Sequence, residues 1–177
     1  MGQSLAALSQ ATMRIIMDDK ELRETAYHEA GHYVAKWALV GEAVYGDNLS
    51  IVPDNEKGTL GHCQPLEENI DSEESCRAYI ISLYAGAAAQ NCICSDAQLV
   101  RAGANSDDEM AEKYLSMQSE SEAELREQTQ QIIDANWLVV ERIAKQLLKY
   151  RKLDADESRF LAENDIESLE RYRQLKP

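Results

Sequence analysis

Apolar residues recur at helical spacing along a segment that starts near Asp18 and stops near Gly41. Asp18 and Glu21 have the spacing of a helix-capping box, and glycine commonly ends a helix. The apolar positions cover most of the surface of such a helix: Ala26, Tyr27, Ala30, Val34, Ala35, Trp37, Ala38 and Leu39. Because a helix that is apolar on most sides is usually buried, the pattern predicts a buried helix. This helix also carries His28 and His32.

Two short runs with β-branched residues follow this helix. Leu49–Pro53 and Thr59–Gln64 are separated by Asp54–Gly58, whose composition is typical of a turn, so the arrangement predicts a small β-hairpin. Pro53 has no amide hydrogen for a strand ladder, which places it at a strand end or on an edge. We expect His62 to be a strand residue near the cleft beside the histidine-bearing helix, with direct contact to a substrate as the less favoured alternative. Because neighbouring strand side chains alternate between faces, His62 and the cysteine after it could not easily reach one metal ion.

Helical periodicity returns after the hairpin. A capping pattern at Asp71 predicts a helix that runs to about Cys94, and residues 95–105 are expected to form a loop. A second capping pattern, at Ser106, predicts the start of the next helix.

The C-terminal part of the chain is also helical in pattern. A capping pattern at Ser121 predicts the longest helix of this part, which keeps its apolar period up to about Tyr150. Asp154 and Asp165 each mark the start of a short helix.

These elements predict a mainly α fold of the α+β class, with a small β-hairpin or sheet beside the histidine-bearing helix. The length of 177 residues suits one compact domain, and 44% hydrophobic with 28% charged residues is ordinary for a globular protein. We see no repeat and no linker. We therefore expect a single domain over residues 1–177, with a core of about 19–163 and a helical C-terminal extension of 154–177.

The net charge of -14 changes the range of expected partners. Such a charge repels phosphate backbones and anionic lipid head groups, so we expect no nucleic-acid partner and no membrane partner, although many cytosolic proteins are acidic simply to stay soluble. No window is apolar enough to span a membrane, and residues 1–17 lack the features of a secretory signal, which favours the cytoplasm. The cysteines are expected to be reduced and mostly buried: Cys63, Cys76, Cys92 and Cys94.

The candidate chemistry lies in the sequence His28-Glu29-Ala30-Gly31-His32. Residues four apart return to the same face of a helix, so the two imidazoles can hold one metal ion. Glu29, displaced around the helix, can take a proton from the attacking water, which is the division of labour in an HExxH zinc site. The alternative is a chance pattern on a solvated helix. The apolar surroundings argue against it, because burying this polar trio without a metal would be unfavourable.

Several segments resemble the FtsH family of ATP-dependent zinc metallopeptidases. The first is Thr25–His32, which resembles the family's zinc-site helix. Leu49–Pro53 with Leu60-Gly61 resembles the family's strand pair, and Leu83–Ala89 resembles its Ala-Gly-rich helix. Ala102–Asp107 resembles the segment with the third ligand, and Ala144–Leu148 with Leu153–Glu157 resembles the closing helices. Several ordered motifs over about 24–163 are far more specific than HExxH alone.

The resemblance implies a role for each site residue. His28, His32 and Asp107 would be zinc ligands, and Glu29 the general base. Asp107 would lie in the first turn of the helix that Ser106 opens, where the helix dipole favours a carboxylate. Asp108 is its rival for the third ligand, and the register of the family segment selects Asp107.

The sequence departs from the family pattern at positions that surround the ligands. Gln90 and Asn91 stand where the family has two glutamates, Ala87 replaces the usual arginine, and Glu112 replaces a usual threonine. The expected ligands are present, so we expect metal binding to persist, although the residues that tune it have changed.

Two functions are compatible with these features. The first is a zinc-dependent peptidase that acts on unfolded or peptide substrates, either alone or with a separate ATPase partner, since this sequence has no GxxxxGK[ST] phosphate loop. The second is a non-catalytic peptide- or partner-binding module that keeps the fold and a metal. The presence of Glu29 favours the peptidase, because a purely structural site gains nothing from a general base. The family forms rings, so a homo-oligomer is possible.

Overall fold

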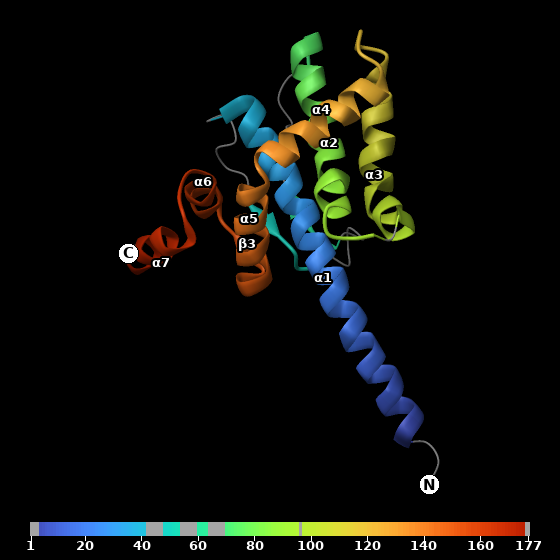
Figure 1. Ribbon diagram of the computed structural model, residues 1–177, viewed down its shortest axis with the longest axis vertical. Coiled ribbons are helices and arrows are strands. Elements are labelled where there is room, and N and C mark those ends of the chain that lie inside the picture. The colour runs from blue at the N-terminus through green and yellow to red at the C-terminus, as the bar shows by residue number, and fades with distance from the viewer. Residues whose placement is uncertain (1–3, 42–47, 54–59, 64–69, 96, 176–177) are drawn as a thin grey trace.

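The computed structural model describes residues 4–41, 48–53, 60–63, 70–95 and 97–175, and it describes their side chains except those of 4–18, 97–99 and 101–103. Within these ranges the chain forms seven helices and one small antiparallel sheet (Figure 1). The elements are α1 (Ser4–Val40), β1 (Leu49–Ser50), β2 (His62–Cys63), α2 (Glu73–Asn91), α3 (Ala97–Leu115), α4 (Glu122–Ala135), α5 (Trp137–Tyr150), β3 (Lys152–Leu153), α6 (Ala155–Glu163) and α7 (Ile166–Leu175). The prediction of a mainly helical domain with a small sheet is confirmed.

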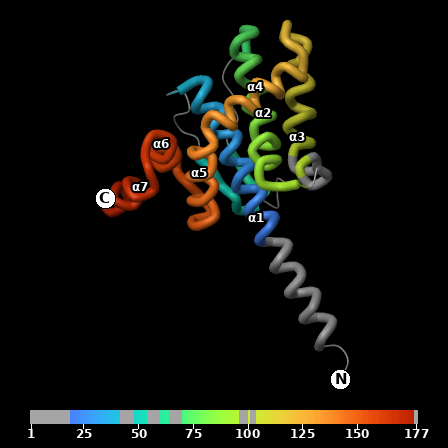
Figure 2. The backbone as a smooth tube through the Cα atoms, viewed as in Figure 1, coloured from blue at the N-terminus to red at the C-terminus, as the bar shows by residue number. Residues whose placement is uncertain are grey.

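Helix α1 lies at the centre of the fold, with α2 along one side and α5 along another (Figures 1 and 2). Helix α3 contacts α2, α4 crosses α2, and α6 follows α5. The main core gathers apolar side chains of α1, α2 and α5 with Leu49, Ile51 and Leu153 of the sheet region. Tyr27 of α1 stacks on Trp137, which begins α5, at a centroid distance of 5.6 Å. The predicted burial of the histidine-bearing segment is confirmed.

The sheet has the strand order β2-β1-β3, and both pairs are antiparallel. Leu49 pairs with Cys63, so the predicted hairpin partners do meet, although each strand is shorter than expected and residues 54–58 of the predicted turn lie outside the described ranges. Leu49 also pairs with Leu153 of β3, a strand that the sequence pattern did not predict because it is only two residues long. Helix α1 contacts both β1 and β2, which places the sheet beside the histidine-bearing helix.

Several helix ends agree with the predictions. Gly41 has a φ of +58°, the left-handed conformation that suits a residue just after a helix. Ser121 and Asp154 cap α4 and α6 through reciprocal capping boxes with Glu124 and Glu157. These three ends are confirmed.

Other helix ends differ from the predictions. Helix α1 begins at Ser4 rather than near Asp18, and the segment before Asp18 is rich in good helix formers. The first residue of the capping box at α2 is Ser72, one residue after the expected Asp71, and its partner is Ser75. The loop expected at 95–105 is wrong, because α3 runs through 97–105. The long helix expected from Ser121 is divided at Asn136 into α4 and α5.

Two other features of the described residues bear on the predictions. No described helix is long and apolar enough to cross a membrane. None of the four cysteines forms a disulfide within the described residues; Cys76 and Cys94 are buried, Cys63 is partly buried and Cys92 is exposed.

Gly31 lies at a close contact between α1 and α2. A Cβ atom at this position would lie 2.7 Å from the Cβ of Ala89 and closer still to the carbonyl oxygen of Ala85, distances that real Cβ atoms do not reach. The absence of a side chain therefore lets the two helices touch backbone to backbone, as expected from a glycine in a helix interior.

We expect Gly31→Ala to reduce the free energy of unfolding by about 1–3 kcal/mol, because overpacking outweighs the better helix propensity of alanine. Urea denaturation followed by circular dichroism measures this change. Glu21→Ala, at an exposed position of the same helix, is the control and should remain within about 0.5 kcal/mol of wild type. An unfolding free energy for Gly31→Ala at or above the wild-type value would contradict the close approach.

Candidate metal centre

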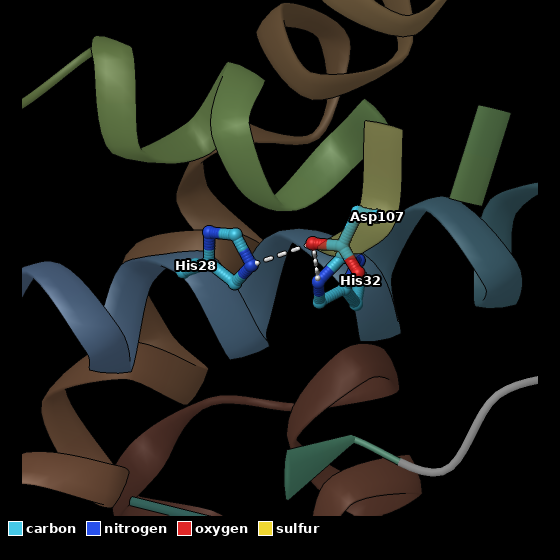
Figure 3. A group of neighbouring side chains, drawn as sticks. All are labelled: His28, His32 and Asp107. Atoms are coloured by element: carbon cyan, nitrogen blue, oxygen red, sulfur yellow. Dashed lines mark hydrogen bonds and ion pairs between the residues drawn. The ribbon is translucent and has the colours of Figure 1, made fainter. Parts of the chain in front are cut away.

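Three side chains from two helices converge beside α2 (Figure 3). His28 and His32 come from α1, and Asp107 comes from α3. Asp107 Oδ2 lies 3.1 Å from His28 Nε2 and 3.4 Å from His32 Nε2. The ligand atoms that these residues can offer all lie within 4.8 Å of one another, close enough for one metal ion to contact all three.

Helix geometry explains why these residues meet. His28 and His32 are four residues apart and share one face of α1, and their rings lie edge to face at 84°. Asp107 lies in the middle of α3, not in a first turn opened by Ser106 as expected, so the predicted N-terminal dipole contribution is wrong. The interior of a regular helix holds Asp107 in place instead. Asp108, next in sequence, is directed elsewhere and accepts a 2.8 Å hydrogen bond from Arg126 of α4.

The second nitrogen of each ring also faces an acceptor. His32 Nδ1 lies 2.7 Å from the backbone carbonyl oxygen of Ser82, and His28 Nδ1 lies 3.3 Å from Gln90 Oε1. A neutral imidazole has only one N–H. If Nδ1 carries that hydrogen and donates it to the acceptor nearby, Nε2 presents a lone pair. A cation between the two Nε2 atoms and Asp107 satisfies this donor set, which is the arrangement typical of metal-binding histidines.

A glycine of α2 provides the space for such an ion. A Cβ atom at Gly86 would lie 2.6 Å from the Nε2 atoms of both His28 and His32. Any larger residue would therefore press on both nitrogens that face Asp107. The absent side chain, the two lone pairs and the carboxylate together fit a zinc ion, whose preferred protein ligands are histidine nitrogen and carboxylate oxygen.

Glu29 lies next to the first histidine and is only 7% exposed. Burial raises its pKa from 4.5 to about 7, with smaller effects from the nearby charged groups. Gly61, immediately before β2, leaves room for Glu29, because a Cβ atom there would lie 2.8 Å from Glu29 Cγ and closer still to its Oε1. A buried carboxyl whose pKa lies near neutrality is suited to accept and return a proton.

Asp107 shows the opposite behaviour. Burial by itself raises the pKa of this carboxyl, but when His28 and His32 carry hydrogens at Nε2 in the metal-free protein, their hydrogen bonds and charge outweigh burial and hold the pKa far below its usual range. A bound metal cation takes the place of those hydrogens. Asp107 is therefore ionised at neutral pH, the form in which a carboxylate binds a metal.

Comparisons with known proteins agree with this geometry. Residues 15–118, more than half of the chain, match peptidase family M41. The chain belongs to peptidase family M41. YTA10, a component of the mitochondrial inner membrane m-AAA protease of Saccharomyces cerevisiae, is 37% identical over 87 residues. The match covers 46% of this chain and 10% of that protein, so the chain spans a small part of its relative. The resemblance to an FtsH-family peptidase domain is confirmed.

Membership of the M41 family makes a peptidase-type function the general expectation, and the residues named from the sequence can be placed within it. The structure brings together His28, His32 and Asp107, with Glu29 beside them. Their individual roles stay predictions. His62 is an exposed residue of β2 and does not join the cluster of possible metal ligands found among the described residues.

The positions that depart from the family pattern separate into two groups. Gln90 is buried and contacts His28, so this substitution does alter the surroundings of a site residue. Asn91 and Glu112 are exposed, and Ala87 contributes to a small apolar cluster between α2 and α3. Sequence reasoning missed the contact of His32 with Ser82, because a backbone carbonyl leaves no mark in the sequence.

The raised pKa of Glu29 predicts a pH dependence in the metal-free protein. Because the folded state keeps the proton up to about pH 7 and the unfolded state loses it near 4.5, stability is fully present below pH 4.5 and is lost as the pH rises toward 7. The loss is about 3 kcal/mol, at roughly 1.36 kcal/mol for each pKa unit.

The measurement is the unfolding free energy of chelated wild type minus that of Glu29→Gln across this pH range. We expect the difference to fall as the pH rises. Glu21→Gln, an exposed position on α1, should give a flat difference. A flat difference for Glu29→Gln as well would mean that Glu29 ionises like a surface glutamate.

Proposed function

We propose that this domain is a zinc-dependent peptidase in which His28, His32 and Asp107 hold the metal and Glu29 is the general base. The observation that carries the proposal is the convergence of two Nε2 atoms and one carboxylate while both Nδ1 atoms face acceptors. Zinc, when bound, acts as a Lewis acid that polarises the peptide carbonyl and lowers the pKa of water.

Glu29 moves the proton in this proposal. Its carboxylate accepts a proton from the attacking water and later delivers it to the nitrogen of the departing amine. Burial, which raises the pKa of Glu29 to about 7 in the metal-free protein, supports both steps, because it favours a carboxyl that can take and release a proton near neutral pH. The enclosure of Glu29 by α1 and Gly61 supports a fixed position for the carboxylate.

We propose that the substrate is an unfolded or extended peptide lying along β2. This strand is at the end of the order β2-β1-β3, and the residue before it, Gly61, adjoins Glu29. An extended chain added to such an edge is bound through backbone hydrogen bonds with little demand on sequence. We further propose that a separate ATPase partner or a homo-oligomer brings the substrate to the site. We place the domain in a reducing compartment such as the cytoplasm, where buried thiols like that of Cys76 stay reduced.

The test combines zinc content with cleavage of unfolded casein. We expect one zinc per chain in protein that has never met a chelator, loss of zinc in His28→Ala and His32→Ala, and cleavage that stops with chelator and returns with zinc. Zinc-free wild type, after refolding with zinc, would refute the metal site. Bound zinc without cleavage at any incubation time would favour the non-catalytic binding module.

A further inference from the structure

Two buried polar side chains lie beyond the predicted ligands, between α1 and the end of α2. Glu24 is 9% exposed and Gln90 is 4% exposed. Glu24 and His28 are four residues apart on α1, so they share one face of the helix, and Gln90 contacts both. Gln90 Nε2 lies 3.5 Å from Glu24 Oε2, and Gln90 Oε1 lies 3.3 Å from His28 Nδ1.

The chemistry of Glu24 determines which way the amide of Gln90 points. A carboxylate can only accept hydrogen bonds, so the amide nitrogen of Gln90 must face Glu24. The amide oxygen then faces His28, and that oxygen can only accept. His28 Nδ1 must therefore carry the hydrogen, which leaves the lone pair at Nε2, the atom 3.1 Å from Asp107.

The two histidines differ in how their orientation is secured. The partner of His32 is the carbonyl of Ser82, which belongs to the backbone of α2 and cannot turn around. The partner of His28 is a side-chain amide, which can present either a donor or an acceptor if nothing holds it. Glu24 supplies that restraint.

Glu24 gains little else from this position. Its Oε1 is buried and has no hydrogen-bond partner among the described residues; its ion pair is a 3.7 Å contact with Lys20 Nζ, whose side chain is 57% exposed and contributes little. A buried, incompletely satisfied carboxylate is unfavourable for folding. Stability therefore does not explain why a carboxylate is here.

We propose that Glu24 is a positioning residue of the metal centre, which acts through the amide of Gln90 to make His28 Nδ1 a donor and His28 Nε2 a ligand. The inference rests on the proposed zinc site. It assigns the pair a role in preparing one ligand for the metal. In many metal sites a carboxylate accepts directly from the histidine N–H. Here the amide of Gln90 lies between the carboxylate of Glu24 and His28.

The experiment is a charge exchange in the full chain, read by zinc affinity. Glu24→Gln should weaken zinc binding about tenfold, at the lower end of the loss typical for groups that orient a ligand. Gln90→Glu places two carboxylates together and should also weaken it. The double variant should regain nearly wild-type affinity, because the carboxylate at position 90 accepts from Nδ1 while the amide at position 24 donates to it. Glu21→Gln, an exposed charge removal on the same helix, should leave affinity unchanged.

Two further readouts separate positioning from a structural role. Glu24→Gln removes a buried charge, so the unfolding midpoint of the metal-free variant should stay at or above that of wild type. In the zinc-loaded protein, NMR should show the Nδ1 hydrogen of His28 exchanging faster with water in Glu24→Gln, while that of His32 is unchanged and serves as reference.

The outcomes distinguish the inference from the proposed function. Equal zinc affinity of wild type and Glu24→Gln would leave the proposed function standing and overturn the positioning role of Glu24. A double variant no better than the weaker single variant would overturn it too, as would a Glu24→Gln affinity loss accompanied by a lower unfolding midpoint and an unchanged His28 signal. Wild type that binds no zinc would overturn the proposed function, and with it the positioning role of Glu24.

Discussion

Replacing Glu29 with glutamine is expected to lower the rate of casein cleavage by about 10²–10⁴-fold while the zinc content stays at one per chain. Glutamine has nearly the same shape, so it fits the space that Gly61 leaves beside β2. It cannot accept a proton, so the step assigned to Glu29 is lost. The predicted ligands His28, His32 and Asp107 are untouched.

The measurement pairs initial cleavage rates with elemental analysis of the same samples. Glu21→Gln is the matched control, because it makes the same chemical change at an exposed position of α1 and should keep the full rate. Loss of zinc together with cleavage would show that Glu29 supports the metal rather than the proton transfer. A rate within a few-fold of wild type, with zinc retained, would remove Glu29 from the proposed mechanism.

Helix ends set by local capping were predictable from sequence, and those set by tertiary packing were not. At Ser121 the side chain accepts from the Glu124 amide and Glu124 bonds back, so four residues determine the end. Ser106 has the same pattern with Glu109, yet both are exposed residues inside α3. The helix continues before them because Val100 and Ala104 pack into a small apolar cluster with residues of α2 and its end.

The division of the long helix at Asn136 has a local cause that the apolar period concealed. Its side-chain amide donates to the carbonyl of Ile132 at 2.9 Å, and its φ and ψ of -113° and 18° leave the helical region. Asparagine competes in this way with the helical ladder. Apolar periodicity continues across the break, since both helices contact α1, so periodicity alone predicts one helix.

The candidate site was predictable only in part. The spacing of His28 and His32 was enough to place both on one face of a helix. Asp107 is distant in sequence, and only the resemblance to a family brought it forward. Gln90 was noticed as a departure from the family pattern, but its contacts with His28 and Glu24 depend on how closely α1 and α2 approach. That approach depends on Gly31. A glycine inside a helix indicates a close contact, but the sequence does not say which element makes it.

The choice between Asp107 and Asp108 as third ligand leads to the second large expected effect. Asp107 was expected at a helix start, whereas Asp107 and Asp108 both lie well inside α3, where neighbouring side chains point about 100° apart. Asp107 contacts both Nε2 atoms, and Asp108 pairs with Arg126. Only one of the two can therefore face the metal.

Asp107→Asn is expected to weaken zinc binding by more than about 100-fold, because removing a ligand carboxylate should exceed the 10–100-fold loss typical of groups that merely orient ligands. Asp108→Asn removes a half-exposed ion pair with Arg126, and such pairs contribute about 0–1 kcal/mol, so its zinc affinity should stay near the wild-type value. Competition titrations against a chromophoric chelator measure both constants, and circular dichroism checks that both variants fold. If Asp108→Asn loses zinc and Asp107→Asn keeps it, the third ligand is Asp108, and α3 must turn by one residue about its axis when the metal binds.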